Sequence, residues 1–467
     1  MSTAVTDTEA DGLFSRSPFY QEVELGGGEW FVYNSLLNSP RIVDAAALEL
    51  LKFFESASSI EDCRSRYSGE VDEVLAEMIS SNLIVPYGSD ERREIRRRQD
   101  SFIDEAVAGT RLRKLEIAIS DACNLRCPHC MHFNNGAASS GKVVNISHTA
   151  ITLAIENFIA ALPESFDEVI HVHFGNGEPL INWKAIEFAV GYCESKSDYK
   201  FKYAINSNLT LMSEEIAQFM ARYRFRISTS LDGIKDVNDR QRVSKAGKGS
   251  YDRTLQGMRL LRDAGHPVDG FTATITDKNF FETDHRLVDL AVELGIKEIA
   301  MDFDLVNSTT YRVDECVALV FGLRQYARNS GVSLFGNWET PFKMLIAESW
   351  AKNAYAYCPA MDGSTLEFGV DGKIKTCGHT NTVVAENFDA KSALSKGSRY
   401  HNLLAERLPN NMDYCRGCEI EGACGGQCHV TQEAALVSPD ILPRMCDIMR
   451  KMTKNLIIEQ YGARTQT

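Results

Sequence analysis

The chain has 467 residues, which is too long for one ordinary hydrophobic core, so at about 150 residues per domain we expect about three domains. Its formal net charge of −14 argues against a general nucleic-acid or membrane-surface binder, because phosphate groups require a basic face. No stretch approaches the roughly 20 apolar residues of a membrane span, and the polar, acidic start lacks the features of a secretory signal. We therefore expect a cytoplasmic protein whose 13 cysteines stay reduced and are available for metal binding.

The N-terminal part predicts a small α+β unit. Residues 1–18 are polar and are expected to be a disordered tail, with order beginning near Phe19. Alternating apolar residues around the glycines at 26–28 predict a hairpin, and three short helices follow, capped by Asp44, opened by Ser59 and spanning 71–79. A strand near 83–86 completes a winged-helix-like module over 19–88, and a charged linker helix follows over 89–112.

From residue 113 short apolar runs alternate with helix-length amphipathic segments. Strands are predicted at 114–119, 168–174, 202–206, 226–230, 270–276 and 298–303. Such alternation predicts βα units and a parallel sheet, and six units suit a partial (βα)6 barrel over 113–345. After residue 345 the cysteines crowd together, so residues 346–450 are expected to form a domain organised by metal, with 451–467 as a C-terminal tail.

Three cysteines, Cys123, Cys127 and Cys130, follow the first strand of this barrel with the spacing Cys-x3-Cys-x2-Cys. Three thiolates in one loop can hold three irons of a cubane and leave the fourth iron open. A zinc site would normally bring a fourth nearby Cys or His, ferredoxin spacings differ, and structural thiols would not gather at a strand end. The spacing therefore favours an iron-sulfur site.

This loop and three further segments, in the same order, resemble the radical S-adenosylmethionine (SAM) superfamily. HFGNGEPL matches its Gly-Gly-Glu-Pro segment with Asn176 in place of the first glycine, SNLTLM matches its polar pair, and SLDG with Arg242 matches its fourth-strand pattern. The resemblance implies an α/β fold built on a TIM-like partial (βα)6 barrel. It also implies a [4Fe-4S] cluster on the three cysteines, where SAM is cleaved by one electron from a flavodoxin- or ferredoxin-type donor to a hydrogen-abstracting 5′-deoxyadenosyl radical. The residues it places against SAM are His129, Asn176, Gly177, Glu178, Ser207, Asn208, Ser230 and Arg242.

Seven further cysteines resemble the SPASM domain, which recurs in peptide maturases. The resemblance implies an outer auxiliary cluster on Cys415, Cys418, Cys424 and Cys446, and an inner one on Cys358, Cys377 and Cys428, so that three [4Fe-4S] clusters are expected. Eight-cysteine members carry a further ligand where this chain has Ser364. Ser364 or Asp362 then completes the inner site, the cluster is smaller, or one iron is open to a substrate thiolate. A pair of zinc knuckles is the alternative, because Cys-x2-Cys-x5-Cys-x3-Cys can bind zinc.

Residues 19–88 resemble the peptide-recognition element of ribosomal-peptide biosynthesis, which binds a leader peptide as an added β-strand. The alternative is a winged-helix-like domain used only for packing or dimer contacts. Nucleic-acid binding is not expected, because residues 20–87 contain no basic recognition helix.

Together these features predict a peptide or protein maturase. The first expectation is a thioether between a Cys sulfur and a carbon, because the missing inner ligand suits a substrate thiolate. Carbon–carbon crosslinking or another oxidative modification is the second, a formylglycine-forming sulfatase maturase the third, and a non-catalytic iron-sulfur or zinc scaffold or sensor is the alternative of a different class. Asp302 and Asp304, at the end of the sixth strand, are candidates for the catalytic base, or they only cap a loop.

Overall fold

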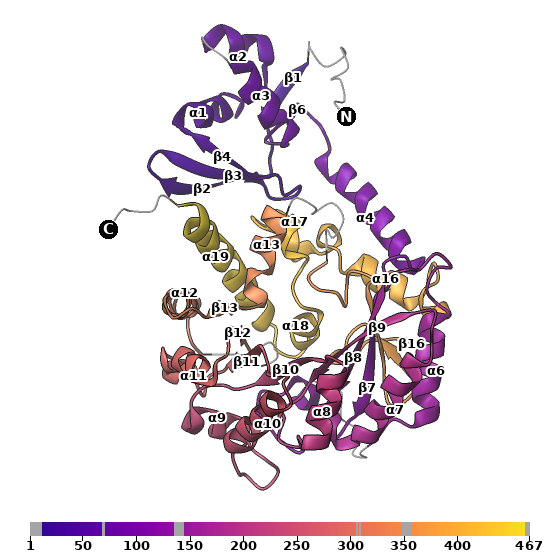
Figure 1. Ribbon diagram of the computed structural model, residues 1–467. Helices are drawn as coiled ribbons and strands as arrows, with labels where there is room; N and C mark the ends of the chain where they lie inside the picture. The colour runs from indigo at the N-terminus through magenta and orange to yellow at the C-terminus, as the bar shows by residue number, and fades with distance from the viewer. Residues whose placement is uncertain are drawn as a thin grey trace.

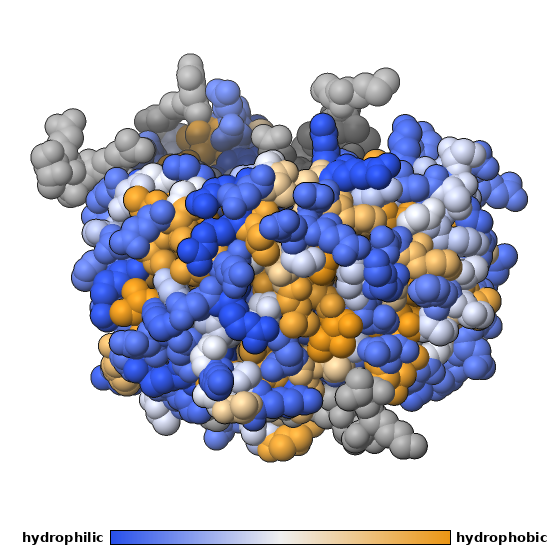
Figure 2. Space-filling model, turned by 60° about the horizontal axis from the view of Figure 1, so that its bottom comes forward, coloured by the Kyte–Doolittle hydropathy of each residue, from blue (hydrophilic) through white to orange (hydrophobic). Residues whose placement is uncertain are grey.

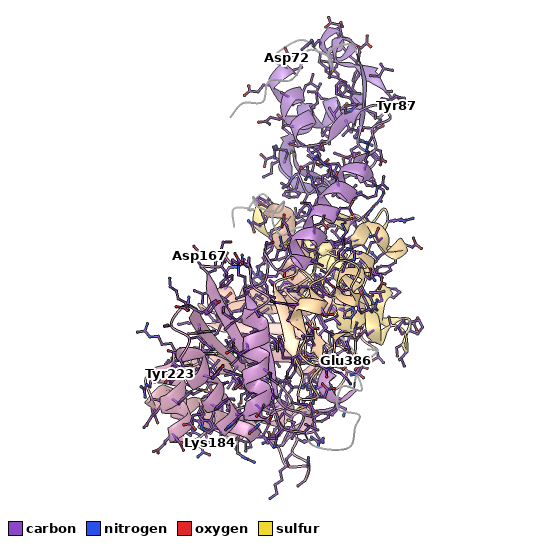
Figure 3. All side chains as sticks on the ribbon, turned by 90° about the vertical axis from the view of Figure 1, so that its right-hand side faces the viewer. Asp72, Tyr87, Asp167, Lys184, Tyr223 and Glu386 are labelled. Carbon is purple, nitrogen blue, oxygen red and sulfur yellow. The ribbon has the colours of Figure 1, made fainter. Side chains whose placement is uncertain are left out.

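The computed structural model describes residues 12–67, 71–134, 144–304, 307, 310–347 and 356–462. An N-terminal unit stands at one end, marked by Asp72 and Tyr87, and the α/β region with Lys184 and Tyr223 lies at the other (Figure 3). Hydrophilic residues are interspersed with hydrophobic ones over the face at the bottom of that region (Figure 2). No helix in the described ranges is long and apolar enough to cross a membrane.

The centre of the α/β region is a ten-stranded sheet with the order β13-β12-β11-β10-β9-β8-β7-β14-β15-β16. All six predicted strands are confirmed, with ends that differ from the prediction by at most two residues: β7 (Lys114–Ser120), β8 (Val169–Asn176), β9 (Lys200–Asn206), β10 (Arg226–Ser230), β11 (Gly270–Ile275) and β12 (Glu298–Phe303). They pair in parallel and in chain order, and β13 (Ser333–Phe335) extends the sheet beyond β12. The α/β fold with a parallel sheet is therefore confirmed.

Helices follow each of these strands. They are α5 (Met131–Asn134), α6 (His148–Ile159), α7 (Trp183–Glu194), α8 (Glu214–Arg222), α9 (Lys235–Gln241), α10 (Tyr251–Asp263), α11 (Arg286–Leu294) and α12 (Val313–Asn329), with the short 3-10 turns η1 (Pro179–Asn182) and η2 (Phe280–Glu282). Ser147 and Ser213 cap α6 and α8 by accepting backbone N–H groups with their hydroxyls. Each long helix buries an apolar face in the main core, as α8 does with Ile216, Ala217 and Met220.

The N-terminal unit contains two small sheets, β2-β3-β4 and β5-β1-β6. The predicted hairpin and three helices are confirmed as β2 (Tyr20–Gly26), β3 (Glu29–Asn34), α1 (Ala45–Phe53), α2 (Ile60–Arg66) and α3 (Val71–Ser80), joined by β4 (Arg41–Asp44), β5 (Ser58–Ser59) and β6 (Ile84–Pro86). Asp44 and Ser59 cap α1 and α2 as expected. This unit has a separate hydrophobic core that includes Phe14, Leu51 and Phe54.

Order begins earlier than Phe19, so the expected tail over 1–18 is wrong for its last part. β1 (Leu13–Arg16) pairs with both β5 and β6, and Phe14 is buried. The pairing is with residues far along the chain, which a short polar stretch cannot reveal by itself. Residues 1–11 lie outside the described ranges.

A charged helix, α4 (Glu91–Val107), runs from the N-terminal unit toward the C-terminal region (Figure 1). That region contains β14 (Thr365–Phe368), β15 (Ile374–Lys375), β16 (Val383–Ala385), η3 (Asn337–Glu339), η4 (Pro409–Asn411), η5 (Asp413–Cys415), α13 (Thr340–Ile346), α15 (Ala390–Ala393), α16 (Arg399–Glu406), α17 (Glu421–Cys424), α18 (His429–Ala434) and α19 (Ile441–Tyr461). β14 pairs in parallel with β7, and β15 and β16 follow it in antiparallel. The cysteine-rich segment therefore continues the barrel sheet.

The expected tail over 451–467 is wrong as far as residue 461. Helix α19 continues through Tyr461, whose ring lies 5.2 Å from that of Phe31 in β3. Met452, Leu456 and Ile457 are buried in the main core, so the apolar face of α19 carries on past the expected boundary.

The N-terminal unit docks on the loop that holds the second cysteine set. Gly422 N donates to Ser35 O at 2.7 Å, and Asn38 Nδ2 donates to Gly422 O at 2.9 Å. Arg92 of α4 makes a two-pronged ion pair with the buried Glu421, with N–O distances of 2.6 and 3.0 Å. A Cβ atom on Gly422 would lie 2.2 Å from Leu36 O, so the two backbones approach too closely for a side chain.

We predict that Gly422→Ala weakens this docking. Overpacking of this kind costs about 1–3 kcal/mol and should lower the melting temperature and expose residues 20–90 to protease. Gly191→Ala in α7, where an added Cβ meets nothing within 4 Å, is the matched control and should leave the protein as stable or slightly more so. Equal melting temperatures for the two variants would contradict the docking contact.

Candidate functional site

The predicted site residues of the barrel come from the carboxyl ends of its parallel strands, where βα folds place their active sites. The loop after β7 carries Cys123, Cys127 and Cys130, and Cys130 N donates to Cys127 O at 3.1 Å. Leu125 N points at Cys123 Sγ, 3.4 Å away, and Arg126 N donates to Val243 O at 2.7 Å. The loop is thus folded on itself and tied to the segment that follows α9.

The three thiols are neighbours. Burial raises the pKa of Cys123 to about 12, and the sulfurs of Cys127 and Cys130 add to that increase. Burial likewise raises the pKa of Cys127 to about 11, with Arg242 opposing it. Such thiols are poor isolated nucleophiles, and a bound metal is what would hold them as thiolates.

The segment after β8 packs directly on this cysteine loop. Gly177 N donates to Ser120 O at 3.1 Å and Glu178 N to Ala122 O at 2.8 Å. A Cβ on Gly177 would lie 2.3 Å from Ala122 O, so glycine is required for this contact. Asn176 has φ of 90°, a left-handed conformation that Asn tolerates, and its Nδ2 donates to Asp121 Oδ1 at 3.1 Å.

Glu178, which follows β8, is linked through its carboxylate to the segment that follows β9. Its Oε1 accepts from Ser207 Oγ at 2.8 Å and from Leu180 N at 3.1 Å, and its Oε2 accepts from Asn208 N at 2.8 Å. Burial raises the pKa of Glu178, and these hydrogen bonds partly offset the increase. Asn208 Nδ2 in turn donates to Asn124 Oδ1 at 3.0 Å, beside Cys123. The structure therefore brings Glu178, Ser207 and Asn208 together next to the cysteine loop.

Arg242 and His129 meet at Asp232, which the sequence analysis did not select. Asp232 Oδ1 accepts from Arg242 Nη2 at 2.8 Å and from Thr274 N at 2.9 Å, and Asp232 Oδ2 lies 3.8 Å from His129 Nε2. Burial lowers the pKa of His129. Burial also acts to lower the pKa of Arg242, but the nearby Asp232 carboxylate acts in the opposite direction, and the pKa of Arg242 is raised overall. Ser230, at the end of β10, is half-buried and pairs with Thr272, and its hydroxyl makes no hydrogen bond to the described residues.

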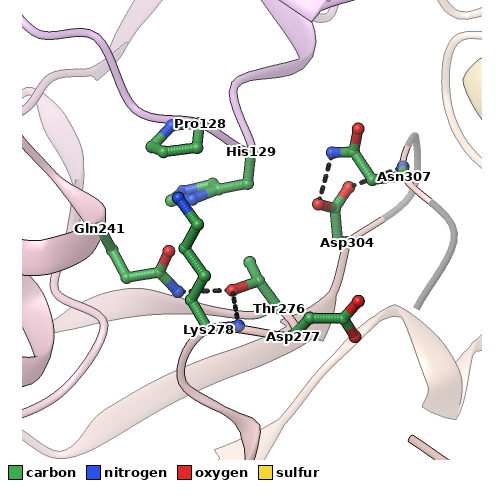
Figure 4. Close-up of a pocket in the computed structure, with 8 residues that line it drawn as sticks. All are labelled: Pro128, His129, Gln241, Thr276, Asp277, Lys278, Asp304 and Asn307. Atoms are coloured by element: carbon green, nitrogen blue, oxygen red, sulfur yellow. Dashed lines mark hydrogen bonds between the residues drawn. The ribbon is translucent and has the colours of Figure 1, made fainter. Parts of the chain in front are cut away.

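The two candidate bases lie in different surroundings. Asp304 lines a cavity of about 230 Å³ with His129, Gln241 and Lys278, and its carboxylate accepts from Asn307 (Figure 4). Asp302 instead accepts from Asn337 N at 2.6 Å, and burial raises its pKa to about 6. Its charge also adds to the pKa increase that burial causes at Cys428. Asp304 therefore belongs to the His129 cavity, whereas Asp302 lies toward the second cysteine set.

The predicted inner cysteines gather beside the barrel interior. Burial raises the pKa of Cys358 to about 12 with help from Cys428, and raises that of Cys377 well above its usual range with help from Glu116 and both other cysteines. Cys377, Ser364 and Pro359 line a cavity of about 1020 Å³ that extends along the inward faces of β7–β10. Ser364 N donates to Asp362 Oδ1 at 2.8 Å, so both proposed replacements for the missing cysteine lie in this neighbourhood.

The predicted outer cysteines also form one group. Burial raises the pKa of Cys415 well above its ordinary value, and Cys424, Cys446 and Cys418 all add to the increase. The four line one small cavity with Arg450, which lies 3.9 Å from Cys418 Sγ. Across the described ranges, no group of three or more His, Cys, Asp or Glu side chains is arranged to hold a single metal ion. The remaining cysteines, Cys63, Cys193 and Cys316, are fully buried, as expected for structural thiols.

Comparison with known proteins agrees with this geometry. Residues 117–294 match the model of the Radical SAM superfamily. The chain is 21% identical over 459 residues to the radical SAM cyclopropyl synthase TigE of Paramaledivibacter caminithermalis, covering 94% of this chain and 95% of TigE. It is 24% identical to the serine-type anaerobic sulfatase-maturating enzyme of Klebsiella aerogenes, covering 68% and 79%. The structure of Streptococcus suis SuiB bound to its precursor peptide SuiA superposes with a TM-score of 0.53 and 16% identity over 89% of this chain and 96% of SuiB, which is a likeness of fold.

We predict that Asp232→Asn destabilises the protein. Without the carboxylate, the buried Arg242 guanidinium has lost its counter-charge, which costs about 3–5 kcal/mol for a buried pair. Thermal unfolding of the anaerobically purified protein measures the loss. Asp236→Asn, at an exposed position on α9, is the control and should melt like the wild type. If both variants melt with the wild type, the buried ion pair contributes nothing to the fold.

The donor set fits SAM and an iron-sulfur cluster. Three neighbouring thiols stand in one loop, and around them several buried polar atoms have no hydrogen-bond partner among the described residues: His129 Nδ1, Asn176 Oδ1, Asp232 Oδ2 and Arg242 Nε. Buried polar atoms are normally paired, so these mark the place of a polar ligand. Residues 117–294 are thus a radical SAM domain, and the chain is an enzyme that uses SAM and a [4Fe-4S] cluster.

Proposed function

We propose that the chain is a peptide or protein maturase that joins a substrate Cys sulfur to a substrate carbon in a thioether. The observation that carries this proposal is the position of Cys377, which lines the barrel cavity beside Ser364. Among the described residues, three cysteines gather at this inner site, where a fourth ligand is expected. A peptide thiolate in the cavity would supply it.

The chain's own residues have distinct tasks in this reaction. When bound, the cluster and SAM would supply the radical that removes one hydrogen atom from the substrate. Glu178 and Arg242 are the charged groups available for the amino and carboxylate ends of SAM, which requires Arg242 to share its hydrogen bonds between Asp232 and the ligand. Closing the sulfur–carbon bond also releases a proton from the thiol and one electron. Asp302, on the side of Cys428, is the candidate proton acceptor, and an iron-sulfur cluster held by the inner cysteines would supply the electron acceptor.

The N-terminal unit is proposed to bind a leader segment of the substrate. β4 ends the β2-β3-β4 sheet and, within the described residues, pairs with β3 alone. Ile42 on this strand is 48% exposed. An extended peptide could therefore pair with β4 and place an apolar side chain against Ile42. The docking of this unit through Gly422 and Glu421 would bring the leader close to the C-terminal region.

Carbon–carbon bond formation is the second candidate. It is favoured by the likeness to TigE, a cyclopropyl synthase that the chain matches over 94% of its length. Formylglycine formation is a further candidate on the likeness to the Klebsiella sulfatase-maturating enzyme. The candidates differ in what happens to a substrate cysteine and in whether an aldehyde forms, so product analysis by mass and by reaction with a hydrazide separates them.

We predict a peptide product that has lost two hydrogen atoms together with one alkylatable thiol. The enzyme is co-expressed with each short peptide encoded beside its gene, and the peptides are treated with iodoacetamide and analysed by mass spectrometry. A thioether product resists alkylation at the linked cysteine, because its sulfur is already bonded. The Cys377→Ala enzyme should give little product, whereas Cys193→Ala, which removes a buried thiol of α7, should give as much as wild type.

Other masses would overturn parts of the proposal. A loss of two hydrogens with the thiol still alkylated indicates carbon–carbon closure if the product does not react with a hydrazide, and formylglycine made from serine if it does. Loss of sulfur from cysteine indicates formylglycine made from cysteine. No change in any candidate peptide, with SAM still cleaved, would contradict a peptide substrate among them. Deleting the N-terminal half of a modified peptide tests the leader: unchanged yield would reject leader binding at β4.

A further inference from the structure

The large barrel cavity has a basic wall in an acidic protein. We propose that it binds an acidic segment of the substrate peptide, with carboxylates held by Lys202, Arg224 and Arg226. This inference rests on the proposed peptide substrate and specifies its chemistry. All three cations line the cavity and are exposed.

The register of the sheet places basic side chains on one face. Lys114 lies opposite His171, and His171 lies opposite Lys202, so that the three form a row across β7, β8 and β9. Arg226 of β10 lies opposite Ala204, two residues further along β9 than Lys202. Residues two apart on a strand point to the same side, so Arg226 belongs to the same inward face. The row crosses the amino-terminal ends of the strands. It lies away from the carboxyl-terminal edge of the sheet, which we call the SAM edge because the residues expected to contact SAM lie there.

Three of the cations that line the cavity have no counter-charge within the described ranges of the chain. Arg113 is neutralised by Glu168, with N–O distances of 2.6 Å, and Lys114 lies 3.4 Å from Glu116. In contrast, the side chains of Lys202, Arg224 and Arg226 make no ion pair or hydrogen bond to any part of the chain that the structure describes. Free cations on a cavity wall are available to a ligand, and arginine can bind a carboxylate through two hydrogen bonds.

The charges of Lys202, Lys114 and Arg226 all act on the His171 imidazole. Burial lowers the pKa of His171, and Lys202, Lys114 and Arg226 lower it further, which places these cations around one imidazole. Elsewhere the chain is acidic, with a formal net charge of −14. The cavity lining has an excess of positive charge, since Glu116, which also lines it, is paired with Lys114. A cavity with such an excess concentrates ligands of the opposite sign, so carboxylates are favoured here and repelled by most of the remaining surface.

The shape of the cavity suits a peptide. Its lining also includes the half-buried Ala204 and Tyr223, which add apolar surface for uncharged side chains. From Arg226 to Ser230, at the SAM edge, β10 rises roughly 13 Å at about 3.3 Å per residue. An extended peptide that runs along β10 with one carboxylate on Arg226 therefore reaches Ser230, at the SAM edge, about four residues further along its chain.

The test is peptide binding to the anaerobically purified full-length enzyme, followed by fluorescence anisotropy. The probes are fluorescein-labelled, C-terminally amidated Gly-Ser peptides of equal length that carry several Asp, Asn or Lys residues. We expect the Asp peptide to bind at least about tenfold more tightly than the Asn peptide, with the difference shrinking as salt is added. The Lys peptide should bind least.

Two matched variants locate the site. Lys202→Gln/Arg226→Gln should remove the preference for Asp, whereas Lys391→Gln/Lys454→Gln, which loses the same charge at exposed positions outside the cavity, should keep it. Lys202→Arg/Arg226→Lys preserves the charges and should also keep it, which separates lost charge from lost folding.

Three results would overturn the proposal: equal binding of the Asp and Asn peptides, an intact preference in Lys202→Gln/Arg226→Gln, or tighter binding of a labelled oligothymidylate than of the Asp peptide. The assay needs no SAM cleavage. Failure of the proposed reaction would therefore leave this binding intact, and failure of acidic binding would leave the product analysis unaffected.

Discussion

The parallel pairing of β14 with β7 is the constraint on which the arrangement of the site depends. Thr365 lies opposite Lys114 and Phe368 opposite Ile117, so the cysteine-rich region begins as a continuation of the barrel sheet. This pairing carries Cys358 and Cys377, on either side of β14, to the barrel interior. The same strand β7 leads into the loop of Cys123, Cys127 and Cys130. One strand therefore has the loop of Cys123, Cys127 and Cys130 at its carboxyl end and, through its pairing with β14, the inner cysteines beside it.

Charge is distributed unevenly around this frame. At the carboxyl ends of the strands, Asp232, Glu178 and Arg242 are buried and held by defined hydrogen bonds, which suits a ligand with both an amino and a carboxylate group. At the amino-terminal ends, Lys202, Arg224 and Arg226 line an open cavity and have no ion-pair partner among the residues that the structure describes. The two ends are thus suited to different molecules, a small zwitterion at one and a longer acidic chain at the other.

Much of the fold could be predicted because its signals are local. Apolar runs of strand length located β7–β12 within two residues, and polar caps such as Asp44 and Ser59 located α1 and α2. The missed parts depend on distant partners. β1 is ordered by β5 and β6, and the last half of α19 by the core under β3, and neither partner can be inferred from the segment itself.

The candidate site could likewise be predicted where its signals are local, and it was missed where it depends on distant partners. The spacing of Cys123, Cys127 and Cys130 identified one group, because a loop motif carries its own geometry. The resemblance to the SPASM domain implied the other two groups, whose members the structure also brings together. Asp232 was overlooked because an Asp before Gly is typical of a turn, and only the fold buries it against Arg242. Lys202 and Arg226 were overlooked for a similar reason: a cation alternating with apolar residues is typical of a solvated strand face, and only the fold shows that this face lines a cavity.

The most direct test of this account is anaerobic reconstitution with iron and sulfide, with metal counting and chromatography of 5′-deoxyadenosine after addition of SAM and dithionite. Wild type should bind roughly twelve irons, or eleven if the inner cluster is smaller, and should cleave SAM. A Cys123→Ala/Cys127→Ala/Cys130→Ala variant should lose about four of these irons and all cleavage while keeping the rest. Zinc in place of iron, or no 5′-deoxyadenosine from wild type, would contradict the account and leave a metal-bound scaffold as the better explanation.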